Sequence, residues 1–146
     1  MYDTILVPVD GSEPSTAAIE HARNLAQHEG ATVHVIHAIE MRSPGVTMGR
    51  VPTDVMTDVQ EEAEQLVNDA TDTLEAAGID TRSEVVDGTA SEAIPEYASE
   101  HDIDLIVMGT HGQAGLDERF LGSVTERVVR TSDLPVLTVS DGAVEE

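Results

Sequence analysis

The chain has 146 residues, of which 29 are acidic and only seven are basic, so its formal net charge is −22. This length fits one domain with one hydrophobic core. Hydrophobic residues make up 40% of the chain but aromatic residues only 2%, so Val, Ile, Leu, Ala and Met must build that core. No stripe of basic residues is available to meet phosphates, which argues against a nucleic-acid partner.

The sequence also indicates where in the cell the protein is located. No apolar run approaches the roughly 18 residues of a membrane span. The first residues lack the basic stretch of a signal peptide. We therefore expect a cytoplasmic protein with no membrane association. Cysteine is absent, which excludes disulfides and thiolate metal sites.

The charge balance is unusual because every basic residue is an arginine and lysine is absent. Such an acid excess is typical of a disordered chain or of a folded protein adapted to high salt. The regular apolar pattern argues against disorder. At about 1 M salt the Debye length is roughly 3 Å, so the self-repulsion would be screened. We therefore expect a halophilic source.

The first third of the chain alternates strand and helix patterns. Residues 4–9 form a short apolar, β-branched run that predicts a buried strand. Residues 14–29 have apolar positions at helical spacing, with Ser12 as a candidate N-cap and Gly30 suited to the C-terminal end. Residues 32–38 predict a second strand.

The rest of the chain continues this alternation. Residues 41–53 hold two glycines and two prolines without a period, which predicts a loop. The predicted elements that follow are a long helix at 54–77, a strand at 83–87, a helix at 90–100, a strand at 104–109, a short helix at 123–131 and a strand at 135–139. Pro95 must either lie in the first turn of its helix or kink it.

Strict alternation of strands and helices predicts an α/β fold with one open, twisted sheet of five parallel strands and helices on both faces. We expect one domain over residues 1–140 and an acidic tail over 141–146. In such folds, ligands bind beyond the carboxyl ends of the strands, where the strand order reverses. If the first and fourth strands flank that point, Asp10 and Gly109 face each other there.

The segment from Gly109 to Ser123 is rich in glycine and precedes the last helix. Gly109 and Gly112 are expected to take positive φ and to let the backbone approach a ligand. Gly122 and Ser123 open the helix, where free N–H groups and the helix dipole favour an anion. The Ser123 hydroxyl either caps the helix or donates to a phosphate. A plain connecting loop with a capped helix is the alternative.

Two common phosphate-binding motifs are excluded. The segment has no Gly-Lys-Ser/Thr sequence, so it is not a Walker loop, and it lacks the Gly-x-Gly-x-x-Gly pattern of dinucleotide-binding folds.

The chain resembles the universal stress protein family, of the UspA type and its nucleotide-binding subgroup, over nearly its whole length. The residues Gly109-x2-Gly112-x9-Gly122-Ser123 are similar to the family pattern Gly-x2-Gly-x9-Gly-Ser/Thr. Residues 5–12 resemble the family's first strand and turn, and residues 135–139 resemble its last strand, which pairs two subunits in many members. The resemblance implies a Rossmann-like sheet, also described as adenine nucleotide alpha hydrolase-like, with strand order 3-2-1-4-5. It also implies a homodimer joined through residues 135–139.

The resemblance further implies a site for ATP, ADP or AMP. Asp10 would approach the ribose or a phosphate-bound Mg²⁺, and the backbone of Ala38 would read the adenine edge. The other implied contacts come from the ends of the first and fourth strands, from the glycine-rich segment and from the start of the last helix: Pro8, Val9, Met108, Gly109, His111, Gly112, Gly122, Ser123, Val124 and Thr125.

The chain departs from the family at Gln113. Many members carry a basic residue just after the second glycine, so one positive charge beside the phosphates is missing here. This puts triphosphate affinity in question. Arg127 and Arg130 lie one to two turns inside the helix, where they either compensate in part or are surface charges; for Arg130 we expect a surface charge.

The six histidines raise the question of a metal site. His34 and His37 point to opposite faces of a strand and cannot share an ion. His21 and His28 are expected on the solvated side of a helix. His111 either touches phosphate or is exposed. We expect no metal role apart from the nucleotide.

The leading hypothesis is therefore a homodimeric nucleotide-binding stress or regulatory protein, in which binding orders the segments 39–53 and 109–121. No general base for hydrolysis is evident. Two alternatives stay open. One is an interaction module that has lost nucleotide binding, which Gln113 and the acidic Asp117 and Glu118 favour. The other is a slow ATPase or autophosphorylating protein, with Ser123, Thr125 or Thr110 as acceptor.

Overall fold

The computed structural model describes residues 2–39, 53–110 and 122–140. Within them the chain forms nine elements in the predicted alternation. These are β1 (Thr4–Pro8), α1 (Glu13–Glu29), β2 (Thr32–Ile39), α2 (Thr53–Ala76), β3 (Thr81–Asp87), α3 (Ala90–Glu100), β4 (Leu105–Gly109), α4 (Ser123–Thr131) and β5 (Val136–Val139). The predicted elements are confirmed, with ends shifted by no more than one or two residues. Residues 40–52 of the predicted loop and the predicted tail 141–146 lie outside the described residues.

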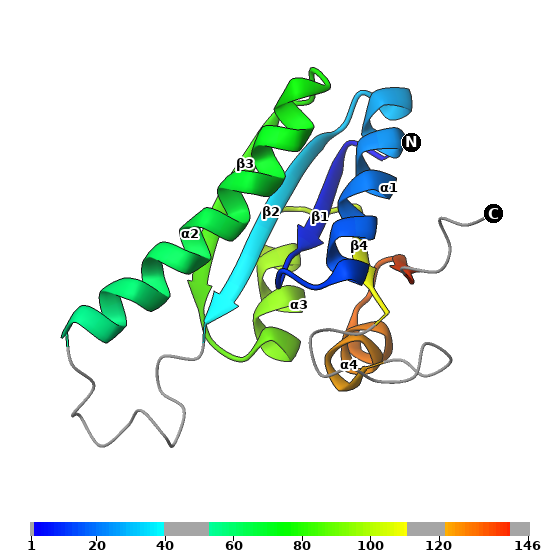
Figure 1. Cartoon of the computed structure of the whole chain (residues 1–146). Helices are drawn as coiled ribbons and strands as arrows, with labels where there is room; N and C mark the ends of the chain where they lie inside the picture. Colours follow the sequence, from blue (N-terminus) through cyan, green and yellow to red (C-terminus); the bar gives the residue numbers. More distant parts are fainter. Residues whose placement is uncertain (1, 40–52, 111–121, 141–146) are drawn as a thin grey trace.

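The five strands form one parallel sheet in the order β3-β2-β1-β4-β5, which confirms the predicted topology. From the central strand β1 the chain adds β2 and β3 on one side and then β4 and β5 on the other, so the strand order reverses between β1 and β4 (Figure 1). β1 pairs with β2 from Thr4 to Pro8. It pairs with β4 only at Ile5 and Leu6, so the ladder between β1 and β4 stops before either strand ends.

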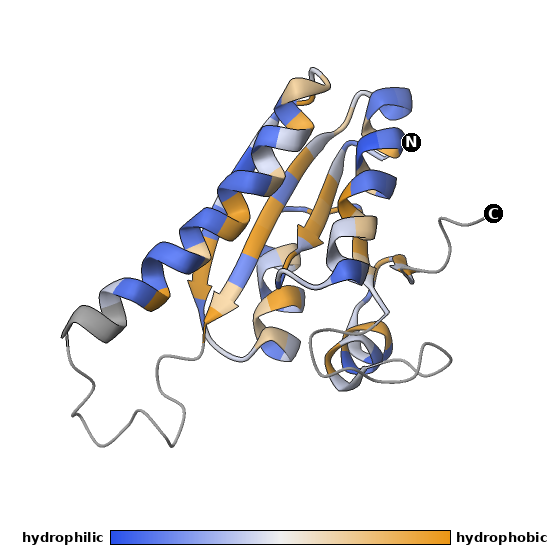
Figure 2. Cartoon of the chain, viewed as in Figure 1, coloured by the Kyte–Doolittle hydropathy of each residue, from blue (hydrophilic) through white to orange (hydrophobic). Residues whose placement is uncertain are grey.

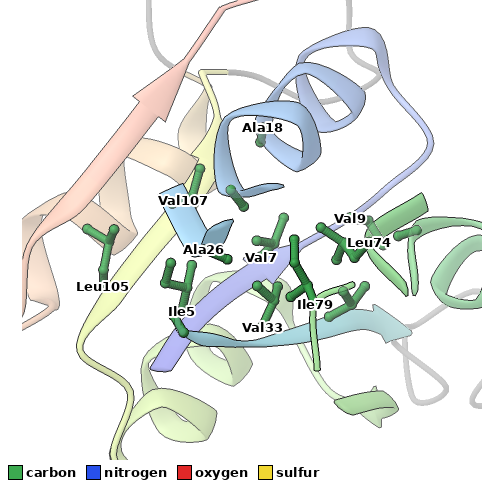
Figure 3. Close-up of a cluster of buried hydrophobic side chains, with 14 of the residues drawn as sticks. Ile5, Val7, Val9, Ala18, Ala26, Val33, Leu74, Ile79, Leu105 and Val107 are labelled. Atoms are coloured by element: carbon green, nitrogen blue, oxygen red, sulfur yellow. The ribbon is translucent and has the colours of Figure 1, made fainter. Parts of the chain in front are cut away.

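Helices α1 and α2 cover one face of the sheet. Alternate residues of the central strand, Ile5 and Val7, point into this layer together with Val33, Val107 and Leu74 (Figure 3). The facing side of α1 is built from alanines, which lets the helix lie close to the strands. Close packing of small and β-branched side chains therefore replaces aromatic bulk in this layer.

Helices α3 and α4 cover the other face. Leu6, Ile36 and Ile106 point into this second layer and meet Ile94 of α3 and Val128 of α4. Both faces of the strands are thus buried, which explains why the strands appear in the sequence as continuous apolar runs rather than alternating ones.

The helix ends show how local sequence fixes these elements. The Ser12 side chain accepts a hydrogen bond from the Ser15 N–H, and Gly30 takes a left-handed conformation with φ of 70°, so both predicted caps of α1 are confirmed. Pro95 lies inside α3, beyond its first turn.

Most of the polar residues of the long helix α2 face away from the sheet. Figure 2 shows hydrophilic residues along the outward side of α2 and hydrophobic ones along the strands. Among the described residues, no helix is both long and apolar enough to cross a membrane.

Candidate functional site

The turn between β1 and α1 holds Asp10 in a fixed conformation. The Ser12 N–H donates to Asp10 Oδ1 at 2.9 Å, and the Asp10 N–H donates to Ser15 Oγ at 3.2 Å. Gly11 between them has φ of 81°, a left-handed conformation that glycine adopts without strain. Asp10 itself is half-buried. Its carboxylate therefore lies at the carboxyl end of β1, beside the N-terminus of α1, where the helix dipole favours negative charge.

Gly109, at the end of β4, packs against the start of α1. A Cβ atom on Gly109 would stand 2.7 Å from Pro14 Cβ and 3.1 Å from the Ser15 nitrogen. The described residues with positive φ do not include Gly109, so the prediction of positive φ at this position is wrong. Because Gly109 has no side chain, the first turn of α1 can pack directly against the end of β4. This packing places the end of β4 beside Ser15, whose hydroxyl also accepts the Asp10 N–H.

The start of α4 is attached to the end of β4 by two hydrogen bonds. The Gly122 N–H donates to the Thr110 carbonyl at 2.7 Å, and the Thr125 hydroxyl donates to the Gly109 carbonyl at 2.8 Å. The proton of the Thr125 hydroxyl is therefore used within the fold. Of the two roles predicted for the Ser123 hydroxyl, capping is wrong: Gly122 is the N-cap and Ser123 is the exposed first helical residue.

Backbone N–H groups are the main polar feature of this helix start. The first hydrogen bond within α4 runs from the Glu126 N–H to the Gly122 carbonyl. The N–H groups of Ser123, Val124 and Thr125 consequently have no acceptor inside the helix, as in any helix N-terminus. Together with the helix dipole, they can accommodate an anion.

The end of β2 carries a residue that the sequence did not single out as part of this site. His37 Nδ1 lies 2.7 Å from the carbonyl oxygen of Val9, just beyond β1. The sequence raises His37 only in the question of a metal site and rejects it there, because His34 and His37 point to opposite faces of the strand. The sequence offers one signal, since His37 is a polar residue near the end of β2, but His34 on the same strand gives the same signal. Ala38 follows it and is half-buried.

The other predicted residues fall at the same edge of the sheet or outside the described ranges. Pro8, Val9, Ala38, Met108 and Gly109 end or follow β1, β2 and β4. The side chains of Val9 and Met108 are buried in the two core layers, so only their backbones can reach a ligand. His111, Gly112 and Gln113 lie outside the described residues.

The two arginines of α4 lie on the surface of the protein. Arg130 pairs with Glu126 at 3.1 Å, and its exposed side chain confirms that it is a surface charge. Arg127 is also exposed and lies 3.9 Å from Glu92. Within residues 2–39, 53–110 and 122–140, no cluster of three or more His, Asp or Glu side chains is placed to hold a metal ion.

The two histidines of β2 differ in their surroundings. His34 points to α3, where its Nδ1 lies 2.7 Å from the hydroxyl of Tyr97, while His37 bonds to the carbonyl of Val9, just beyond β1. Burial lowers the pKa of His34, and the nearby His101 and Arg82 lower it further. Burial raises the pKa of Tyr97 to about 12, so its hydroxyl stays protonated near neutrality.

Comparison with known proteins decides the family. The model of the universal stress protein family matches residues 1–140. The chain belongs to the universal stress protein family. Universal stress protein MJ0531 of Methanocaldococcus jannaschii is 34% identical over 141 residues, which cover 95% of this chain and 82% of that protein.

Solved structures of universal stress proteins share the fold. The structure of MJ0577, a universal stress protein of the same organism, superposes with a TM-score of 0.85 at 32% identity and covers 96% of both chains. A universal stress protein solved in complex with cAMP superposes with a TM-score of 0.74 at 28% identity, covering 96% of this chain and 98% of the other.

Proposed function

We propose that this universal stress protein binds an adenine nucleotide, ATP, ADP or AMP, at the carboxyl ends of β1, β2 and β4. The observation that carries the proposal is the position of the α4 N-terminus and the Asp10 turn at one edge of the sheet, where the strand order reverses. A universal stress protein with 28% identity has been solved with cAMP, which supports an adenine ligand.

In the proposed complex, the phosphates, the ribose and the adenine each contact different residues at the carboxyl ends of the strands. The phosphates lie against the N–H groups of Ser123, Val124 and Thr125, and Gly122 lets them approach. The carboxylate of Asp10 meets a ribose hydroxyl or a Mg²⁺ ion carried by the phosphates. The backbone of Ala38 contacts the adenine. The backbones of Pro8 and Val9 lie near the adenine. Met108, Gly109 and Gly112 surround the ribose and phosphates, and His111 contacts a phosphate.

The charge of the protein affects this binding. With a net charge of −22 and Gln113 in the usual basic position, phosphate binding relies on backbone N–H groups, the helix dipole and bound cations. We therefore propose that affinity for the nucleotide rises with Mg²⁺ and with salt that screens the acidic surface. A halophilic source fits this acidic composition. A cytoplasmic location is part of the same proposal.

The proposed role is regulatory, through a homodimer. In the described sheet β5 is an edge strand, and edge strands offer unpaired backbone groups to a second copy. Leu137 of β5 and Val129 of α4 are exposed hydrophobic residues that a second copy would cover. Nucleotide binding would then be signalled by ordering of residues 39–53 and 109–121.

Direct binding experiments test the proposal. The protein is purified in molar salt and denatured, and the released small molecules are identified. ATP, ADP and AMP are then titrated by calorimetry with and without Mg²⁺. A copurified adenine nucleotide or a saturable heat is the expected result, and the lack of both would overturn the proposal. Turnover of labelled ATP distinguishes binding alone from slow hydrolysis or autophosphorylation.

A further inference from the structure

The pairing between β1 and β2 ends abnormally at Val9. The last main-chain bond from β1 to β2 runs from the Val9 N–H to the Ile36 carbonyl at 2.8 Å. In a regular parallel ladder, the Val9 carbonyl would next accept the N–H of Ala38, because alternate residues of a strand face the same neighbour. The register instead stops at the pair Pro8 and Ile36. The Val9 carbonyl takes its hydrogen bond from the imidazole of His37, at 2.7 Å.

The hydrogen bond to Val9 determines which ring nitrogen of His37 carries a proton. Val9 is 5% exposed, so its carbonyl oxygen needs a partner within the protein. A carbonyl only accepts, so His37 Nδ1 must carry the proton and donate it. The side chain of His37 thus replaces the next main-chain bond of the ladder.

Ala38 is left with open backbone groups as a result. Its N–H and carbonyl face the side of β1, as those of Ile36 do, but β1 has already turned away there: the Asp10 N–H donates to Ser15 Oγ. On the opposite side, β2 stays paired with β3 as far as Ile39 and Asp87, so the strand end is held in place. Ala38 therefore presents a donor and an acceptor from a rigid strand.

We propose that His37 is a positioning residue which, by occupying the Val9 carbonyl, keeps the Ala38 N–H and carbonyl open to read the edge of a purine base. This inference rests on the proposed nucleotide site and adds the source of its base selectivity. Adenine offers a ring nitrogen acceptor, N1, beside an amino donor, which complements the N–H and carbonyl of one residue. Hypoxanthine presents the reverse order, an N1–H donor beside a carbonyl acceptor. The site should therefore prefer AMP over IMP, although both carry the same ribose phosphate.

Two substitutions of His37 separate its donor from its volume. H37N keeps an N–H donor attached to Cγ, where Nδ1 is attached in histidine, so it can still bond to Val9. H37L has no donor and leaves the buried Val9 carbonyl to take the Ala38 N–H, which adds one bond to the ladder. The matched control is H34L, a change of the same type on the same strand, whose native side chain faces α3 instead.

The experiment measures base selectivity and the Ala38 amide together. AMP and IMP are titrated by calorimetry against the wild type and the three variants in the same molar salt. Hydrogen exchange of the Ala38 amide is followed by NMR without nucleotide, and thermal unfolding checks that each variant is folded. One hydrogen bond of ordinary strength corresponds to roughly tenfold in affinity.

The expected results are specific to a positioning role. H37L should lose about tenfold in AMP affinity and its preference for AMP over IMP should fall towards one, while H37N and H34L keep AMP affinity within about twofold. The Ala38 amide should exchange fast in the wild type and slowly in H37L. An unchanged AMP preference in H37L, or an Ala38 amide that is already protected in the nucleotide-free wild type, would overturn the inference.

The experiment distinguishes an error in the proposed nucleotide site from an error in the role of His37. If the wild type binds neither AMP nor IMP, the proposed nucleotide site is refuted, and so is the proposed contact between Ala38 and the base. The exchange measurement still decides separately whether His37 keeps the Ala38 amide open, because it needs no ligand.

Discussion

Gly109 and Pro14 approach each other so closely that a Cβ on Gly109 would stand 2.7 Å from Pro14 Cβ and 2.9 Å from the Pro14 carbonyl carbon. Two residues far apart in the chain thus bring the end of β4 against the first turn of α1. The same turn holds Asp10 through Ser12 and Ser15. Gly109 therefore connects the Asp10 turn with the start of α4, because its carbonyl also accepts the Thr125 hydroxyl at 2.8 Å.

The substitution G109A should destabilise the fold. The new methyl group meets backbone as well as side chain, so the helix must shift, and overpacking of this kind costs about 1–3 kcal/mol. The free energy of unfolding by denaturant at constant salt measures this cost. Nucleotide affinity should fall as well, because the shift moves the Asp10 turn.

The control for G109A is G30A. Gly30 has φ of 70°, and a Cβ added there would meet no atom within 4 Å, so alanine costs only the left-handed backbone, roughly 1–2 kcal/mol. Nucleotide affinity should be unchanged in G30A. A G109A protein with wild-type stability and wild-type affinity would contradict the packing argument.

Ser123 allows the contribution of one backbone N–H to be tested. S123P removes the N–H and the hydroxyl at the first position of α4, where proline is well tolerated in a helix. Gly122 has φ of −68° and ψ of 161°, an extended conformation that suits a residue before proline. The helix should therefore remain intact while a donor to the phosphates is lost.

S123A is the matched comparison, since it removes the hydroxyl alone. We expect S123P to weaken ATP binding about tenfold relative to S123A, as one charge-assisted hydrogen bond is lost. Calorimetry with ATP and with adenosine measures the effect, and adenosine binding should not change. Equal ATP affinity of S123P and S123A would place the phosphates away from the Ser123 N–H.

The sequence predicted the elements well and the contacts between them poorly. Strand and helix periods, the Ser12 cap and the Gly30 end are local signals, and each was confirmed. The roles of Gly109 and Thr125 depend on partners far along the chain: Pro14 for the first, and the Gly109 carbonyl for the second. His37 could not be placed either, because its bond to Val9 depends on where the β1 ladder ends.

Stability should depend on pH through His34. Its pKa is lowered in the folded protein, first by burial and then by the nearby His101 and Arg82, while its hydroxyl partner Tyr97 remains neutral. The folded state therefore favours the uncharged imidazole, and below the ordinary pKa of 6.5 the unfolded chain binds the proton more readily. This contribution to stability is complete above pH 6.5 and is lost as the pH falls through the lowered pKa.

Unfolding by denaturant at a series of pH values from about 8 to about 5 measures this dependence. The wild type should lose more stability than H34L over this range, because leucine has no proton to bind. The carboxylates contribute equally to both proteins and cancel in the comparison. Parallel pH profiles for the two proteins would show that His34 does not titrate differently in the folded state.

Salt should stabilise this protein strongly, because 29 acidic residues face only seven arginines. Repulsion between like charges opposes the compact state, and raising the salt from about 0.1 M to about 1 M shortens the Debye length from roughly 10 Å to roughly 3 Å. The melting temperature should therefore rise steeply at low salt and then level off. KCl and the strongly excluded sulfate salt should give similar curves at equal ionic strength if screening dominates. A rise that appears only with sulfate would indicate enhanced burial of apolar surface instead.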